Sequence, residues 1–304
     1  MARPPDPVSV MGSSIRSARP KWSSQMSLND ILLHVDTYPD ATPPEAIEGA
    51  VGFVRLIGGR VSALAVGVRF PVQSNRVADY LIGLSSMAVD EQAKSLANGQ
   101  ASLAAFTAQA RDAGVLGQAL FETVEYYAVA DHVAGRARTR DLCLVPLGGP
   151  LDGQAEVATS AVFGSGRPVL VYRGGLPAAK LGLVVVAWDG SRCAARALAD
   201  ALPILARAGE VRVLTVINEK PAAVAGLAAE AVRHLKAHGV DAVAEEVDGK
   251  GASIGESLEA YLAKTLPDIL VMGAYGRSRL QEFILGGATE YMLHAPRVPL
   301  FLSH

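Results

Sequence analysis

A group of glycines near the end of the chain has the spacing needed to hold a phosphate group. Gly273 and Gly276 follow the short apolar run 268–272, and nine residues separate Gly276 from Gly286 and Gly287. Glycines after a buried strand let the backbone approach a ligand closely, because they carry no Cβ. A helix is expected to begin at Gly286 and Gly287, and its free N–H groups and positive dipole end attract anions. The pattern therefore predicts a phosphate-binding loop, with tight turns that bind no ligand as the alternative.

This spacing resembles the glycine signature of the universal stress protein family, in which the last glycine precedes Ser or Thr. Gly287 stands at that Ser or Thr position. It still offers an N–H group, but one hydroxyl hydrogen bond of about 1 kcal/mol is absent. Thr289, on the expected first helical turn, would compensate in part. Arg277 and Arg279 lie in the loop and are expected either to neutralise phosphate charge or to be solvated surface charges.

Two other predicted strands end near the same place. Asp189 ends one and Val216 ends the next. In an open α/β sheet, ligands bind beyond the carboxyl ends of the strands, where the strand order reverses. The resemblance implies that Asp189 contacts an adenine base and that the main chain of Val216 meets it. The alternatives are that Asp189 caps the helix starting near Arg192 and that Val216 is a core residue.

The segments that must position these residues occur twice in the chain. The matching pairs of strand-like segments are 28–36 and 181–189, 58–66 and 208–216, 141–145 and 268–272, and 167–172 and 297–302. Helical stretches lie between the strands of the second copy, at 192–208, 222–237 and 254–266. Apolar strands alternating with helices indicate a parallel sheet covered on both faces.

The predicted fold is therefore α/β, with two tandem Rossmann-like domains, each a doubly wound, mostly parallel five-stranded sheet. By resemblance these are universal-stress-protein-type domains at residues 26–173 and 180–304, joined by a linker at 174–179. The first domain has a longer middle, 71–114, that is expected to be helical. The segment after its fourth strand lacks the glycine spacing, and Pro146 has no N–H to donate. The first copy is thus predicted to be degenerate, with the same fold but no nucleotide loop.

Composition narrows the class of protein. The chain has 304 residues, a net charge of −2 and only two cysteines. This favours a cytoplasmic globular protein and gives no electrostatic case for nucleic acid or an anionic membrane. Residues 1–25 are rich in Pro, Ser and Arg. They are interpreted as a disordered tail, or as the product of an upstream start codon when translation truly begins at Met26.

Other groupings favour packing over chemistry. Residues 249–251 lack the surrounding residues of a P-loop, and Ser253 is expected to cap the next helix. His234 and His238 have a metal-compatible spacing but no evident third ligand. Cys193 lies near a helix start that could lower its pKa, although packing is the favoured role. No catalytic or metal site is predicted.

The resemblance implies a sensor or regulator in stress adaptation that binds adenine nucleotide, as ATP with Mg²⁺, and is not an enzyme, although slow ATP hydrolysis stays open. The alternative is a nucleotide-free protein-interaction module of the same fold. The last strands of the two halves, 168–172 and 298–302, are short and apolar. Domains of the family that the chain resembles commonly dimerise through their final strand. The resemblance therefore implies that these two strands pair with each other as an intramolecular pseudo-dimer, and whole chains could dimerise further. The sequence identifies no protein partner.

Overall fold

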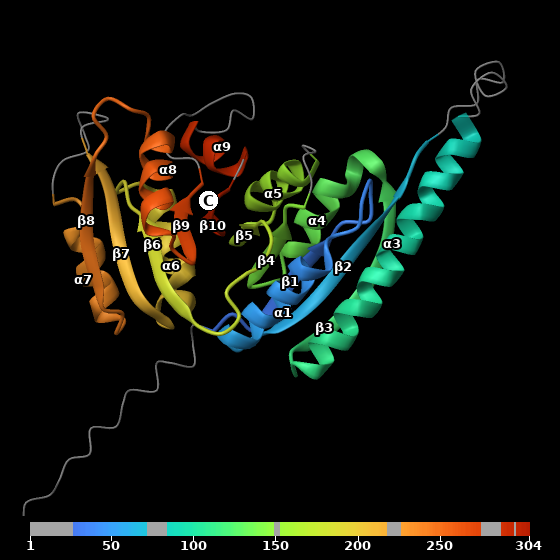
Figure 1. The fold of residues 1–304 in the computed structure, drawn as a ribbon, viewed down its shortest axis with the longest axis horizontal. Coiled ribbons are helices and arrows are strands. Elements are labelled where there is room, and N and C mark those ends of the chain that lie inside the picture. Colours follow the sequence, from blue (N-terminus) through green and yellow to red (C-terminus); the bar gives the residue numbers. More distant parts are fainter. Residues whose placement is uncertain (1–26, 72–83, 149–152, 218–225, 275–286, 295) are drawn as a thin grey trace, which may run out of the picture.

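The computed structural model describes residues 27–71, 84–148, 153–217, 226–274, 287–294 and 296–304. Residues 1–26, 72–83, 149–152, 218–225, 275–286 and 295 lie outside this part of the chain. Ten strands form one continuous sheet with helices on both faces (Figure 1). Among the described residues, no helix has the length and apolar character needed to span a membrane.

The two halves are built from the same series of elements. The first half contains β1 (Asp30–Val35), α1 (Pro44–Ile57), β2 (Arg60–Arg69), α3 (Leu84–Asp112), β3 (Leu116–Glu125), a 3-10 turn (Tyr126–Ala128), α4 (Val129–Ala137), β4 (Leu142–Pro146), α5 (Gly153–Gly164) and β5 (Val169–Tyr172). The second contains β6 (Leu181–Ala187), α6 (Arg192–Leu205), β7 (Ala208–Ile217), α7 (Ala229–Ala237), β8 (Ala242–Asp248), α8 (Ile254–Thr265), β9 (Ile269–Gly273), α9 (Gly287–His294) and β10 (Leu300–Ser303). The predicted α/β class and five strands per half are confirmed.

The strand order is β3-β2-β1-β4-β5-β10-β9-β6-β7-β8. Read outward from the middle, both halves have the same order, and the strands within each half are parallel. At the centre, β5 and β10 pair antiparallel, with Leu300 opposite Val171 and Leu302 opposite Val169. This is the pairing of the two last strands expected from their apolar sequence. Since the seam is antiparallel, the carboxyl ends of the two halves point to opposite edges of the sheet.

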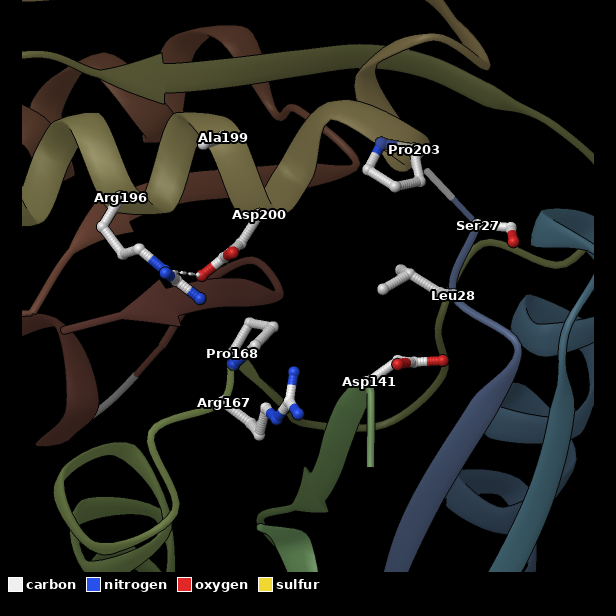
Figure 2. A pocket seen from close by; sticks show the side chains of 9 residues that line it. All are labelled: Ser27, Leu28, Asp141, Arg167, Pro168, Arg196, Ala199, Asp200 and Pro203. Carbon is white, nitrogen blue, oxygen red and sulfur yellow. Dashed lines mark hydrogen bonds and ion pairs between the residues drawn. The ribbon is translucent and has the colours of Figure 1, made fainter. Parts of the chain in front are cut away.

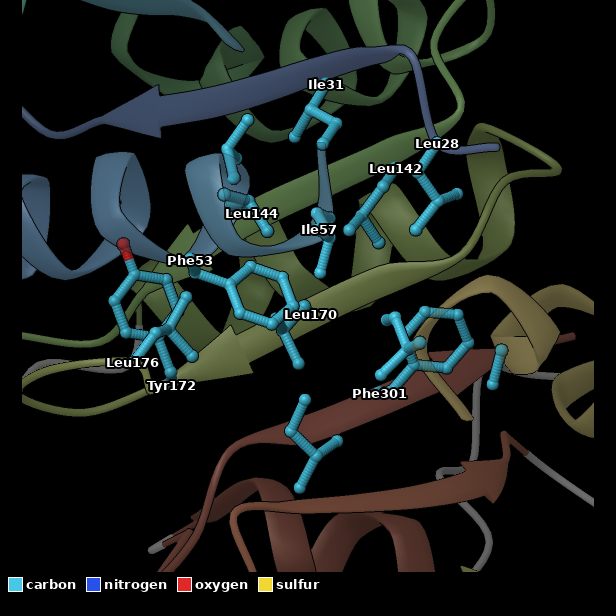
Figure 3. Close-up of a cluster of buried hydrophobic side chains, with 14 of the residues drawn as sticks. Leu28, Ile31, Phe53, Ile57, Leu142, Leu144, Leu170, Tyr172, Leu176 and Phe301 are labelled. Atoms are coloured by element: carbon cyan, nitrogen blue, oxygen red, sulfur yellow. The ribbon is translucent and has the colours of Figure 1, made fainter. Parts of the chain in front are cut away.

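Two apolar layers cover the faces of the sheet. Helices α1, α3, α6 and α7 pack on one face, and α4, α5, α8 and α9 pack on the other. Successive strand residues alternate between the layers, so that Leu33 lies in the first and Leu32 in the second. Each layer includes side chains from both halves, and Leu170 and Phe301 carry the first layer across the seam (Figure 3). The two halves therefore share their cores.

Local sequence signals set the helix ends. Ser253 caps α8 together with Glu256 in a capping box, as expected from the sequence. Gly58 ends α1 with φ of 85°, a left-handed conformation that favours glycine. The expected long helix in 71–114 is α3, which starts at Leu84; residues 72–83 lie outside the described part.

The linker between the halves packs against α1. A Cβ on Gly49 would lie 2.7 Å from the backbone nitrogen of Leu176, and one on Gly52 would lie 2.5 Å from Cβ of Ala178. The absence of side chains at these two helix positions lets the linker backbone run directly over α1. The connection therefore follows a fixed path on the helix surface.

Candidate functional site

The candidate site lies at the carboxyl edge of the second half. Strand β6 is flanked by β7 and β9, and the chain order reverses between β6 and β9. Asp189 follows β6, Val216 is near the end of β7, and Gly273 ends β9. These three predicted site residues thus lie at the ends of adjacent strands, on the edge where open α/β sheets bind ligands.

Asp189 is exposed and shapes the turn that leads into α6. Its Oδ1 accepts a hydrogen bond from the Ser191 backbone N–H at 2.9 Å. Ser191, not Asp189, is the N-cap of α6, because its Oγ accepts from the Ala194 N–H at 3.1 Å. The alternative interpretation of Asp189 as the helix cap is therefore wrong. One side of its carboxylate holds the turn, and the residue faces solvent at the sheet edge.

Trp188, which sequence reasoning did not single out, supports this turn. Its indole Nε1 donates to the carbonyl oxygen of Leu227 at 3.2 Å. Its own carbonyl accepts from Thr215 Oγ1 at 3.1 Å, which ties the end of β6 to β7. Gly190, between Asp189 and Ser191, has φ of 71°, in the left-handed region. In the sequence, the feature that points to this supporting role is an aromatic residue directly before the Asp-Gly-Ser turn.

Gly273 lets the first turn of α6 lie directly against the end of β9. A Cβ at this position would overlap the backbone of Cys193 and Ala194 and would lie 2.9 Å from Cβ of Cys193. The amino end of α6 therefore lies beside the start of the predicted phosphate loop. The close packing alone explains why glycine is required here.

At the other end of the loop, Gly287 is the first residue of α9, as expected for a helix start. It is exposed, and a Cβ there would meet no atom within 4 Å. Thr289 lies on the first turn, as predicted, but it is only 3% exposed. Gly276, Arg277, Arg279 and Gly286 lie outside the described residues, so their predicted roles stay predictions.

Val216 is half-buried and packs against the apolar layer formed by α8 and α9. Its backbone lies in the β7–β8 ladder opposite Val247. The side chain is thus a core residue, as the alternative interpretation held. This location does not test the predicted contact between its main chain and an adenine base.

His304 follows β10 and joins three segments at this edge. Its Nδ1 lies 3.0 Å from the carbonyl oxygen of Ala274 and 3.8 Å from Sγ of Cys193. Its ring contacts Phe163 of α5, with 5.0 Å between ring centroids. The positions of these four residues in the sequence do not predict their contact, because they lie at the ends of different elements.

The prediction that the helix start could lower the pKa of Cys193 is wrong. Burial raises the pKa of this thiol, and Asp189 raises it further, whereas Arg192 opposes the change. Packing, the favoured interpretation, is the observed role. Cys143 is fully buried in β4, and burial raises its pKa to about 12.

The other groupings noted in the sequence form no reactive site in the described residues. The rings of His234 and His238 lie 4.7 Å apart at the end of α7, where Gly239 has φ of 77°. Within the described ranges, no three His, Cys, Asp or Glu side chains are grouped so that they could hold a metal ion. The segment 249–251 is the loop between β8 and α8, as predicted.

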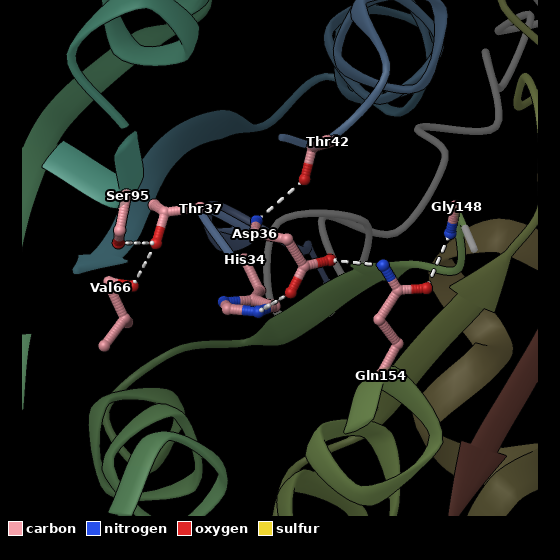
Figure 4. A network of polar contacts seen from close by, with 8 residues as sticks. All are labelled: His34, Asp36, Thr37, Thr42, Val66, Ser95, Gly148 and Gln154. Carbon is pink, nitrogen blue, oxygen red and sulfur yellow. Dashed lines mark hydrogen bonds and ion pairs between the residues drawn. The ribbon is translucent and has the colours of Figure 1, made fainter. Parts of the chain in front are cut away.

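At the equivalent edge of the first half, described side chains form a network of hydrogen bonds (Figure 4). Asp36 corresponds in sequence to Asp189 but is only 8% exposed. Its carboxylate is held by His34 Nε2 at 2.9 Å and by Gln154 Nε2 at 2.9 Å. Gln154 Oε1 also accepts from the Gly148 N–H at 2.7 Å. The amide of Gln154 thus spans the space between Asp36 and the segment after β4.

A small cavity of about 180 Å³ lies where the two halves meet (Figure 2). Several of its charged side chains already form hydrogen bonds or ion pairs with the protein. Asp141 accepts from the Asn29 and Asp30 N–H groups at 2.9 and 3.0 Å, and Arg196 pairs with Asp200 at 2.8 Å. None of the predicted site residues lines it.

These observations define a class of protein: a chain of two doubly wound α/β halves, of which the second has an exposed Asp189 at its carboxyl edge and glycines at the strand end and helix start. The profile of the universal stress protein family matches residues 182–304. The second half of the chain is therefore similar in sequence to the universal stress protein family.

Solved structures support the fold of the whole chain. A universal stress protein from Archaeoglobus fulgidus DSM 4304 aligns with a TM-score of 0.62 and 17% identity, over 91% of this chain and 98% of its own. A functionally unknown protein from Pseudomonas aeruginosa PAO1 aligns with a TM-score of 0.51 and 14% identity, over 92% and 94%. At these identities the likeness is one of fold. No curated protein sequence matches the chain.

Proposed function

We propose that this protein binds an adenine nucleotide, ATP with Mg²⁺, at the carboxyl edge of its second half and acts as a cytoplasmic regulator of a stress response. One observation carries the proposal: an exposed Asp189 lies at the point where the strand order reverses, beside Gly273 and the amino end of α6. A carboxylate can accept hydrogen bonds from an adenine amino group or a ribose hydroxyl. Helix amino ends favour phosphates.

A binding role suits the described side chains better than rapid catalysis. Efficient phosphoryl transfer needs a group that orients the nucleophile and charges that stabilise the transition state. At this edge the Asp189 carboxylate is partly committed to the turn with Ser191, and burial raises the pKa of Cys193. Among the residues that the structure describes, the site thus offers recognition groups without an evident catalytic base.

The alternative function is a nucleotide-free interaction module of the same fold. The observation that favours it is Gly287, which opens α9 without the hydroxyl that the family pattern provides. Thr289 is buried, so its own hydroxyl does not take the place of the missing one at the surface. Under this alternative the same edge would present its backbone groups to a protein partner.

ATP binding to the purified full chain separates the two functions. We expect isothermal titration calorimetry to give one site per chain, and heat-denatured supernatant of the protein to contain adenine nucleotide. Asp189→Ala should weaken binding by about tenfold or more, because a hydrogen bond to a charged group contributes about 1.5–3 kcal/mol. Asp241→Ala, an exposed carboxylate at the start of β8 and so at the opposite edge, is the matched control.

Three results would contradict the proposal. Absence of binding would favour the interaction module. Two sites per chain would show that the first half also binds nucleotide. Equal affinity of Asp189→Ala and Asp241→Ala would place the site elsewhere.

A further inference from the structure

The start of the predicted phosphate loop is fixed by His304. The Ala274 N–H donates to the Ser303 carbonyl at 2.8 Å, and the Ala274 carbonyl lies 3.0 Å from His304 Nδ1. A carbonyl oxygen can only accept, so Nδ1 carries the proton in this bond. Both main-chain groups of Ala274, the residue after Gly273, are therefore held by the chain at the end of β10.

His304 also contacts the first turn of α6. Sγ of Cys193 lies 3.8 Å from the same Nδ1. This turn is the one that packs against Gly273. A change in the position of the His304 ring would thus be transmitted to both sides of the candidate site, namely the loop start and the amino end of α6.

The ring of His304 rests on a residue of the first half. Phe163, in the last turn of α5, meets it edge to face, with 5.0 Å between centroids and 68° between planes. Such edge-to-face aromatic contacts stabilise the position of a ring beyond the burial of its area. In Figure 1 the C-terminus lies between α9 and α5, which agrees with this contact.

Helix α5 is itself held in place at its other end. Gln154, in its first turn, binds both Asp36 and the Gly148 N–H. Between these ends, Val157, Ala158, Ala161 and Val162 pack into the second apolar layer. The helix therefore offers a fixed support on which the His304 ring can rest.

We propose that the first half sets the nucleotide affinity of the second half by positioning the start of its glycine loop through Phe163 and His304. The proposal rests on the proposed function, because the ligand affected is ATP. Phe163 and His304 are positioning residues: Phe163 holds the ring, and the ring holds the Ala274 carbonyl and the α6 turn. The degenerate half is thereby a regulatory domain for the site of its neighbour.

The test is a double-mutant cycle in the full chain. Phe163→Ala and His304→Ala should each weaken ATP binding by about three- to tenfold. The double variant should bind ATP with the same affinity as the single variant that binds it less tightly, because both substitutions remove the same contact. His304→Asn keeps a donor near the Nδ1 position and should recover part of the affinity. Tyr127→Ala removes a 74% exposed aromatic ring from the first half and should change nothing.

A second measurement does not depend on ATP. In the ligand-free protein, hydrogen exchange should rise in peptides covering residues 189–195 and 269–274 in Phe163→Ala and His304→Ala, but not in Tyr127→Ala. If wild type binds no ATP but exchange rises as described, the proposed function fails while the positioning contact stands. Unchanged exchange, or additive losses of affinity in the double variant, would overturn the inference.

Discussion

Gly273 ends β9 against the backbone of α6, whereas Gly287 opens α9 with free space where a side chain would stand. The two glycines belong to the same predicted loop, but their constraints differ. At Gly273 the backbone of the neighbouring helix forbids a side chain. At Gly287 neither a steric contact nor a left-handed φ requires glycine.

Gly273→Ala should destabilise the protein, because its Cβ would overlap the backbone of Cys193 and Ala194, which cannot move aside as a flexible side chain can. Overpacking of this kind costs about 1–3 kcal/mol. Urea unfolding followed by circular dichroism measures the loss. Gly287→Ala adds the same methyl group in open space and is the control. Equal stability of the two variants would contradict the close approach of α6 to β9.

Gly287→Ser should tighten ATP binding by up to about tenfold, because it restores one hydroxyl donor to the phosphate site. The substitution fits, since no atom lies within 4 Å of the added Cβ. Calorimetric titration of wild type, Gly287→Ser and Gly287→Ala separates the hydroxyl from the methyl group. Binding by the Ser variant that is no tighter than by the Ala variant would remove Gly287 from the phosphate site.

Among single residues, those marked by local sequence were predictable. Ser253 was predicted to be a cap because it lies in the loop directly before a helical stretch, and the structure adds Glu256 as its capping-box partner. His304, Phe163 and Cys193 could not be connected, because their contacts depend on the seam between distant strands. Gln154 was missed for the same reason: its partners Asp36 and Gly148 lie on other segments.

At the scale of elements, α5 links the two edges of the sheet. Its first turn closes the ligand edge of the first half, and its last turn reaches the ligand edge of the second. Eight of the strands were located from their apolar runs, because a parallel sheet buried on both faces needs such runs. The outer strands β3 and β8 are half-exposed and carry Glu side chains, and the sequence did not locate them. The side of the sheet that each helix covers follows from packing between elements and was not predicted.

Gln154→Ala should lower the free energy of unfolding by about 1–3 kcal/mol, because it leaves the nearly buried Asp36 carboxylate with one fewer donor and the Gly148 N–H without its acceptor. Chemical denaturation measures the effect. Gln100→Ala, at an exposed position of α3, is the matched control. If both variants are equally stable, the Gln154 amide contributes nothing to closing that edge.

At the scale of the whole molecule, the antiparallel β5–β10 pairing and the shared apolar layers make one body of two similar halves. This pairing was predicted from the dimers that the resembled family forms through its final strand, and from the unpaired apolar edges that the two final strands would otherwise leave. It did not indicate how far the core continues across the seam. Phe301 and Leu170 show that this continuation is part of the fold (Figure 3).

Residues 180–304 expressed alone should form a homodimer, because removing the first half exposes the β10 edge and the fully buried Phe301. A second copy of β10 can replace β5 in the antiparallel pair. Light scattering measures the mass, and Phe301→Lys in the same fragment should shift it towards monomer. A well-folded, strictly monomeric fragment would contradict the edge-pairing argument.

The linker over α1 has a consequence for how such a molecule can evolve. In a symmetric dimer of one short chain, every substitution appears twice, so a change that closes one ligand edge closes both. Here the two copies are covalently joined and inherited as separate stretches of one gene. Pro146 could therefore arise at the end of β4, and Gln154 could fill the edge beside it, while Gly273 stayed at the corresponding end of β9. Because its two halves lie in one chain, this molecule can be asymmetric.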